Sequence, residues 1–231
     1  TISNPTRDED GWESPYTVIN LVIEDLPFVV DSIYELLNKQ DIQNRYSVFN
    51  PLHAEWDNDG SLSVLDDADA EDMTFFLSLQ VERLSKSEIK QLREDIESVL
   101  SDLRLAVDDF EPMLEQARSV GDQLLEYRDL LPDDKELLEE AEEFLRYLID
   151  GNFVFLGYRQ YNLFEQDGQE VLEIEHGSGL GLLQREEMSS FHEPKPLEEL
   201  NEQLQKRITS GFVLIVTKAN SESRVYRRER L

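Results

Sequence analysis

Apolar residues fall at every second position in segment 16–24. Ile19, Leu21 and Ile23 share one face of the expected strand, whereas the other face mixes apolar and polar residues. This two-residue period predicts a strand with one buried face. The same period returns in residues 73–82. Together the two segments predict a sheet that is covered by helices on one side only.

A turn and a helix follow the first strand at once. Asp25-Leu-Pro27 predicts the turn, and Pro27 suits the first turn of a helix because an N–H has no intrahelical partner there. Ile33 and Leu36 continue an apolar face at helical spacing. The segment 28–39 is therefore expected to be a helix.

The segment between this helix and residue 73 predicts a hairpin. A long strand is expected near residues 42–56, Asn58-Asp-Gly60 predicts a tight turn, and residues 61–65 return. The acidic stretch 66–72 predicts a loop.

Helical spacing continues through the middle of the chain. Ser85-Lys-Ser-Glu88 predicts a capping box at the start of a long helix. The apolar seam of this helix has the spacing typical of coiled coils and consists of Ile89, Leu92, Ile96, Val99, Leu103, Ala106 and Phe110. Pro112 marks a break, after which a similar seam consists of Met113, Ala117, Val120, Leu124 and Tyr127. A packed helical connector is favoured over a partner-binding coiled coil, because apolar seams usually pack within one protein.

A third helix is predicted from Asp133 to Asp150, where Gly151 provides a left-handed cap. The residues expected to face inward are Leu137, Ala141, Phe144 and Leu148.

A second β-rich unit is predicted after this helix. The expected strands are 153–161, 171–175 after a turn at Asp167-Gly168, 212–217, and 224–231. A helix before the third of these strands is expected to bury Leu197, Leu200, Leu204 and Ile208.

These patterns predict an α+β protein in four parts. Residues 1–15 are expected to form a lead-in linker, 16–84 a first α+β domain, 85–151 the helical connector, and 152–231 a second α+β domain that is truncated at its C-terminal end.

Composition and charge exclude several classes of function. The net charge of −29 over 231 residues argues against nucleic acid and against anionic membrane surfaces as partners. With no Cys, disulfides and thiolate metal sites are excluded, which favours a cytoplasmic protein. Two explanations of the acidic surface stay open: a salt-rich habitat, or a surface kept soluble by charge repulsion.

The glycines at 177, 179 and 181 invite a nucleotide-binding interpretation. The dinucleotide fingerprint needs a third glycine at position 182, where Leu182 stands, and no helix is expected directly after it. A flexible turn is therefore favoured, and Gly177, Gly179 and Gly181 remain a possible turn site for an anion.

Other catalytic or metal chemistry has little support in the sequence. His53, His176 and His192 lie far apart in different expected elements, so we predict no metal site. With 51 Asp and Glu residues, pairs of carboxylates arise by chance, and none is assigned as a general acid or base.

Three segments carry a family resemblance, and they are Asp25–Ser32, Phe153–Tyr158 with Gly177–Gly181, and Leu214–Ser221. In order and spacing the chain resembles the N-terminal region of the large bacterial NAD-dependent glutamate dehydrogenases. The strand–turn–helix unit at 16–39 resembles the opening of an ACT domain, a ferredoxin-like α+β module that usually senses amino acids.

The resemblance implies two ACT-like units joined by helices. It implies that the parent enzyme converts L-glutamate to 2-oxoglutarate and ammonia with NAD in a separate domain. No catalytic residue and no cofactor is therefore expected in this segment. The implied partners are the remainder of the parent chain, further copies in a homo-oligomer, and an amino-acid effector.

The resemblance also implies an effector site at the first turn, formed by Asp25, Pro27, Asp31 and Ser32. ACT domains that sense amino acids usually have Gly directly after the Pro of this turn, and Phe28 stands there instead. Because only Gly lets a ligand approach the backbone without a side chain, Phe28 is expected to fill the ligand space. The unit could then be a docking module, or an oligomerisation scaffold that uses the outer sheet face of Val18, Asn20, Val22, Phe76 and Ser78.

Overall fold

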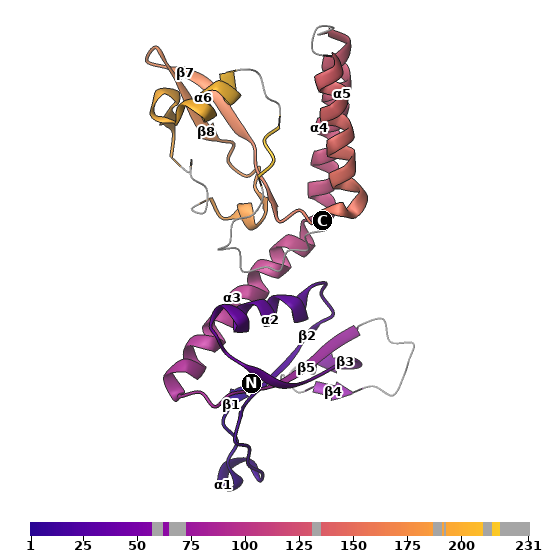
Figure 1. Cartoon of the computed structure of the whole chain (residues 1–231), viewed down its shortest axis with the longest axis vertical. Coiled ribbons are helices and arrows are strands. Elements are labelled where there is room, and N and C mark those ends of the chain that lie inside the picture. Colours follow the sequence, from indigo (N-terminus) through magenta and orange to yellow (C-terminus); the bar gives the residue numbers. More distant parts are fainter. Residues whose placement is uncertain are drawn as a thin grey trace. The chain divides into compact units, whose positions relative to one another are not determined.

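The computed structural model describes residues 1–56, 62–64, 73–130, 135–186, 191, 193–209 and 214–217. The chain divides into two compact units, and among these residues unit 1 runs from Thr1 to Arg104 and unit 2 begins at Leu105 (Figure 1).

Unit 1 contains an antiparallel sheet with the strand order β1-β2-β5-β3-β4. Its strands are β1 (Ile2–Ser3), β2 (Thr17–Glu24), β3 (Asn44–Trp56), β4 (Leu62–Val64) and β5 (Met73–Val81). β2 pairs with β5 along its whole length, with Leu21 opposite Leu77. The predicted strands at 16–24, 42–56 and 73–82 are confirmed. The predicted turn at 58–60 and loop at 66–72 lie outside the described residues.

Two helices cover one face of this sheet, α2 (Val29–Lys39) and the part of α3 (Lys86–Asp108) that lies in unit 1 (Figure 1). The core joins the sheet to both helices, and its central members are at most 2% exposed: Ile19, Leu77, Leu79, Ile33, Leu92 and Ile96. Burying one such side chain stabilises the fold by about 1.5–3 kcal/mol. The prediction of a sheet covered on one side is confirmed.

The N-terminal segment takes part in this sheet. β1 pairs with β2 through Ile2, which is buried and lies opposite Ile19. A four-residue helix, α1 (Arg7–Asp10), follows and is capped by the Thr6 hydroxyl. Residues expected to form a linker therefore contain an edge strand and one short helix.

The predicted capping box begins α3. The Ser85 backbone N–H donates to Glu88 Oε2 at 2.7 Å, and the Glu88 N–H donates to Ser85 Oγ at 3.3 Å. The Glu88 carboxylate accepts from the Ser85 side chain, which is the largest cause, and from the Ser85 backbone N–H, and both lower the pKa of Glu88 below its ordinary value. Two helix-terminal N–H groups are thereby satisfied.

Unit 2 begins with a helical pair. α3 ends at Asp108, and Pro112 lies in the first turn of α4 (Phe110–Leu130), where proline is tolerated. α5 (Lys135–Tyr147) packs against α4 and ends in a π turn in which Gly151 has φ 82°. The left-handed cap is confirmed, and so are the seam residues Met113, Ala117, Val120 and Leu124 of α4. The side chain of Tyr127 lies outside the described part.

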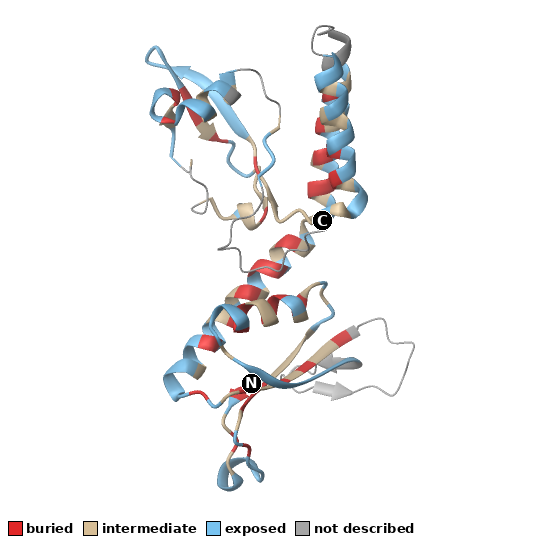
Figure 2. Cartoon of the chain, viewed as in Figure 1, coloured by how far each residue is buried: buried red, intermediate tan, exposed pale blue. Residues whose placement is uncertain are grey.

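The predicted inner face of α5 is confirmed at Ala141 and Leu148 and is wrong by one position at Leu137 and Phe144. Leu137 and Phe144 are 60% and 54% exposed, whereas Leu145 is 3% exposed. Figure 2 shows the buried side of the pair. The residues of α5 and the following turn that contact α4 are Leu138, Ala141, Leu145 and Leu148. Both sets have helical spacing, so only contact with α4 distinguishes them.

Small sheets make up the rest of unit 2. β7 (Tyr161–Gln166) and β8 (Gln169–Ile174) form a hairpin, β10 (Lys195–Pro196) adds to β8, and β6 (Gly157–Tyr158) pairs with β9 (Leu180–Gly181). Asp167 and Gly168 have φ of 54° and 82°, so the predicted turn is confirmed.

Two strand predictions in unit 2 fail. Segment 153–161 contributes only Gly157, Tyr158 and Tyr161 to strands. Residues 214–217 have no regular structure, and Ile215 and Val216 are exposed. The residues of the predicted strand 224–231 lie outside the described part.

The helix predicted before residue 212 is shorter than its apolar pattern. α6 (Glu202–Thr209) contains Leu204 and Ile208, which are partly buried. Leu197 and Leu200 are buried but precede α6 at a short 3₁₀ turn, Leu197–Glu199.

Candidate functional site

The predicted effector residues lie at the junction of β2 and α2. Asp25 and Pro27 are exposed in the turn, and Asp31 is exposed in the first turn of α2. Ser32 is fully buried. The structure thus brings three of the four residues to the surface at the start of α2 and places the fourth in the core.

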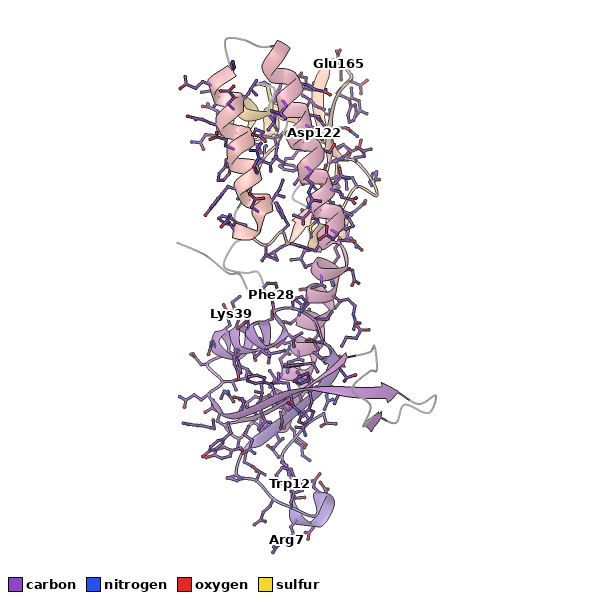
Figure 3. The ribbon with its side chains drawn as sticks, turned by 90° about the vertical axis from the view of Figure 1, so that its right-hand side faces the viewer. Arg7, Trp12, Phe28, Lys39, Asp122 and Glu165 are labelled. Carbon is purple, nitrogen blue, oxygen red and sulfur yellow. The ribbon has the colours of Figure 1, made fainter. Side chains whose placement is uncertain are left out.

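Phe28 has an unusual backbone conformation at this junction. Its φ of 65° and ψ of 9° place it in the left-handed region, and its carbonyl accepts the Ser32 N–H at 2.9 Å. For a residue with a Cβ this conformation costs about 1–2 kcal/mol, whereas glycine adopts it freely. Figure 3 shows Phe28 at one end of α2 and Lys39 at the other. The position therefore suits glycine, and the half-buried ring occupies it at a cost in backbone strain.

An open hollow of about 260 Å³ lies further along α2. It is lined by Tyr34, Leu37, Asn38 and Asn44. None of the predicted effector residues lines it.

The outer face of the sheet in unit 1 combines apolar and polar side chains. The Ser78 hydroxyl donates to the Asn20 side-chain oxygen at 2.7 Å, and Val22 and Phe76 flank this pair half-buried. Exposure is greater on β3, where Tyr46 and Val48 are 62% and 60% exposed.

The glycine segment 177–181 has a packing role in unit 2. A Cβ on Gly179 would overlap the Leu183 carbonyl oxygen and lie 2.9 Å from Arg159 Nη2, and one on Gly181 would lie 2.5 Å from the Leu156 carbonyl oxygen. Gly177 and Gly181 also have positive φ, of 78° and 58°. The spacing of glycines therefore reflects close backbone packing and turn geometry, which favours the turn interpretation over a nucleotide loop.

Asp109 holds the end of this segment. Its Oδ2 accepts the Gly181 backbone N–H at 2.6 Å and the Gln184 side-chain N–H at 2.5 Å. Charge-assisted bonds of this kind are stronger than neutral ones. They fix the glycine segment and the 3₁₀ turn Leu182–Gln184 to the start of α4.

Arg159 is buried beside the glycine segment. Its side chain is 9% exposed, and Nη2 donates to the Leu183 carbonyl. Nε and Nη1 are buried and have no hydrogen-bond partner among the described residues. A buried donor without a partner costs about 1–3 kcal/mol, and more when it is charged. Arg159 was not predicted as a site residue, and its one signal in the sequence is a charge next to the apolar run 153–158.

Glu186 and His176 form a pair close to Arg159. His176 Nδ1 lies 3.0 Å from Glu186 Oε2 and Nε2 lies 3.8 Å from Glu173 Oε1. The hydrogen bond from His176 is the main cause that lowers the pKa of Glu186, and the charge of Arg159 is a smaller one. Of the other two histidines, the His53 side chain and His192 lie outside the described part. Within that part, no group of three His, Asp or Glu residues could hold a metal ion.

Among the described residues, no helix has both the length and the apolar character that crossing a bilayer requires.

Comparisons with known proteins agree on one family. Residues 1–96 match the family described as glutamate dehydrogenase, ACT1 domain. The NAD-specific glutamate dehydrogenase of Halomonas elongata is 33% identical over 187 residues, which cover 78% of this chain and 12% of that protein. The NAD-specific glutamate dehydrogenase of Pseudomonas aeruginosa is 28% identical over 189 residues, covering 78% of this chain and 11% of that protein. The chain thus spans about an eighth of the length of these relatives.

Proposed function

Since the chain is a distant homologue, over most of its length, of the N-terminal ACT1 region of NAD-specific glutamate dehydrogenase, we propose that it acts as a regulatory and assembly segment of such an enzyme. The match of residues 1–96 to the ACT1 domain carries this proposal. The α+β sheet with α2 and α3 on one face supports it, because that architecture suits a sensing module.

The parent enzyme, on this proposal, is a cytoplasmic protein that oxidises L-glutamate to 2-oxoglutarate and ammonia with NAD. The chain would contribute neither catalytic residues nor the NAD site, and the remainder of the parent chain would contain both. The direct test mixes the purified chain with NAD and glutamate and follows NADH by absorbance. We expect no NADH, and turnover by the chain alone would overturn the proposal.

An amino acid is the effector that the β2–α2 turn would suit. Asp25 and Asp31 are exposed there and could receive an ammonium group, since opposite charges attract most strongly at short range. Phe28 occupies the place where a ligand would meet the backbone. Binding would therefore require Phe28 to move, and we expect the wild-type site to be weak.

Thermal shifts with the common amino acids test this site, because a ligand that binds only the folded chain must stabilise it. Phe28→Gly should strengthen binding at the turn by clearing the space. Asp31→Asn should abolish that gain, and Asp8→Asn in α1 is the matched control at another exposed acidic position. Stabilisation of the wild type that Asp31→Asn leaves unchanged would contradict an effector site at this turn.

A pure oligomerisation scaffold is the second candidate function, favoured by the exposed Tyr46 and Val48 on the outer sheet face. Because copies carry a net charge of −29 each, association should strengthen as salt screens repulsion. Sedimentation at low and high salt, with wild type and Val48→Asp, measures this. A strict monomer at high salt and high protein concentration would count against the scaffold.

A further inference from the structure

We propose that Arg159 anchors a binding site for a small carboxylate in unit 2. This goes beyond the proposed regulatory role, since the effector site proposed above lies in unit 1 and Arg159 lies in unit 2.

The buried guanidinium of Arg159 is only partly hydrogen-bonded among the described residues. A guanidinium stays charged in proteins and carries five N–H donors in a planar fork. Leu183 accepts from Nη2 alone, and Nε and Nη1 have no partner among the described residues. Because Nη2 has two N–H bonds, one complete two-donor edge of the fork remains. Such an edge matches the two oxygens of a carboxylate.

The nearby carboxylates are already engaged with other groups. Glu186 bonds to His176, and Asp109 accepts from Gly181 and Gln184. Glu186 is also exposed, whereas the donors of Arg159 are buried. A carboxylate from outside the described residues is therefore the group that would complete the site.

The close packing around Arg159 argues for a small ligand. Gly179 leaves no space for even a Cβ between Leu183 and the guanidinium, and a Cβ on Gly157 would lie 2.9 Å from Leu183 Cγ. A nucleotide would need more room than these contacts leave. A monocarboxylate, or an amino acid bound through its carboxylate, is the smallest ligand that would pair with two donors of the guanidinium.

Entry to the site would pass the short turn Leu182–Gln184. Its three residues are only partly buried or exposed, and it contains Leu183, the acceptor of Arg159 among the described residues. A ligand could reach the buried donors only if this turn moved, and the hydrogen bonds from Gly181 and Gln184 to Asp109 oppose that movement.

The test is calorimetry and NMR on the 231-residue chain with sodium glutamate, 2-oxoglutarate and acetate, against sodium chloride at equal ionic strength. We expect saturable binding of at least one carboxylate and a shift of the Arg159 Nε–H signal, with no effect of chloride. The NMR signal needs no variant, so it holds even if substitutions unfold unit 2. No saturable binding, or binding that leaves this signal unmoved, would overturn the proposal.

Variants locate the site. Arg159→Met should weaken binding about ten- to hundredfold, as expected for loss of charged hydrogen bonds, and Arg159→Lys should retain part of it. Arg146→Met, which removes an exposed arginine of α5, is the matched control and should bind as wild type does. Asp31→Asn should also leave binding unchanged, which separates this site from the β2–α2 turn. Equal binding by folded Arg159→Met and Arg146→Met would contradict the assignment.

Discussion

The two units reach a stable core in different ways. In unit 1, β2 and β5 pair over eight residues, and alternating side chains meet two amphipathic helices. In unit 2, β6 and β9 pair over two residues, and glycines, Asp109 and Arg159 hold the turns that follow. Long regular pairing makes apolar burial sufficient in unit 1. Around β6 and β9 of unit 2, where the pairing is short, particular polar and steric contacts hold the chain, whereas β7 and β8 of the same unit pair over six residues.

This difference bears on function. A regular sheet with one covered face leaves the other available to a partner, which suits assembly. Turns held by a few contacts can enclose a charged side chain such as Arg159, which suits a ligand site. The tryptophans help to separate the two units experimentally, because both, Trp12 and Trp56, lie in unit 1.

The largest effect is expected in the core of unit 1. Leu77→Ala should destabilise the chain by about 3–5 kcal/mol, because it removes a fully buried side chain from the central strand and leaves a cavity. Urea unfolding followed by tryptophan fluorescence reports this unit. Val48→Ala on the neighbouring strand, whose side chain is exposed, is the control and should change stability by less than about 0.5 kcal/mol. Equal destabilisation by Leu77→Ala and Val48→Ala would contradict a core that lies on one face of the sheet only.

A smaller effect is expected in the helical pair of unit 2. Leu145→Ala should cost about 2–4 kcal/mol in the stability of this pair, whereas Leu137→Ala on the same helix should cost less than about 0.5 kcal/mol. The reason is that Leu145 is 3% exposed and Leu137 is 60% exposed. Hydrogen exchange of α4 and α5 measures the difference. A greater loss of stability in Leu137→Ala than in Leu145→Ala would instead support the buried face that the sequence predicts.

Two glycine replacements distinguish the effect of close packing from that of helix propensity. Gly179→Ala should destabilise the turns around residues 177–184 by about 1–3 kcal/mol, because its Cβ would overlap the Leu183 carbonyl. Gly121→Ala in α4 should instead stabilise by up to about 1 kcal/mol, since its Cβ would lie 3.7 Å from Leu145 in ordinary contact. Hydrogen exchange and thermal unfolding measure both. A neutral Gly179→Ala would show that the segment packs less tightly.

Acidification should have the smallest effect, and each unit contains one group that contributes to it. Glu88 and Glu186 have folded-state pKa values below the ordinary 4.5, through Ser85 and His176 respectively. Their contribution to stability is present above pH 4.5 and is lost as pH falls through the folded pKa. Ser85→Ala removes the cap and should cost about 1 kcal/mol at neutral pH. Ser85→Ala and His176→Ala should each reduce the stability that the chain loses on acidification. Urea unfolding as a function of pH checks this, and unchanged acid loss in both variants would contradict it.

Local signals in the sequence were sufficient for most of unit 1. The alternation in 16–24 and 73–82, the turn at Pro27 and the capping box at Ser85 each depend on neighbours within a few residues, so they were predicted from the pattern alone. The glycine cap at Gly151 and the turn at Asp167-Gly168 follow the same rule, because positive φ is a property of one residue.

Contacts distant in sequence decided the rest. Two faces of α5 have helical spacing, and packing against α4 selects the one with Leu145. The conformation of Phe28 breaks the local preference of a bulky residue, and tertiary structure maintains it. Arg159 and the glycine segment approach one another from positions 18 to 22 residues apart. The sequence by itself therefore determined the strands, turns and caps whose energies are local. Only the tertiary structure decided which helical face is buried and which charge is enclosed, because those depend on side chains that meet after the chain has folded.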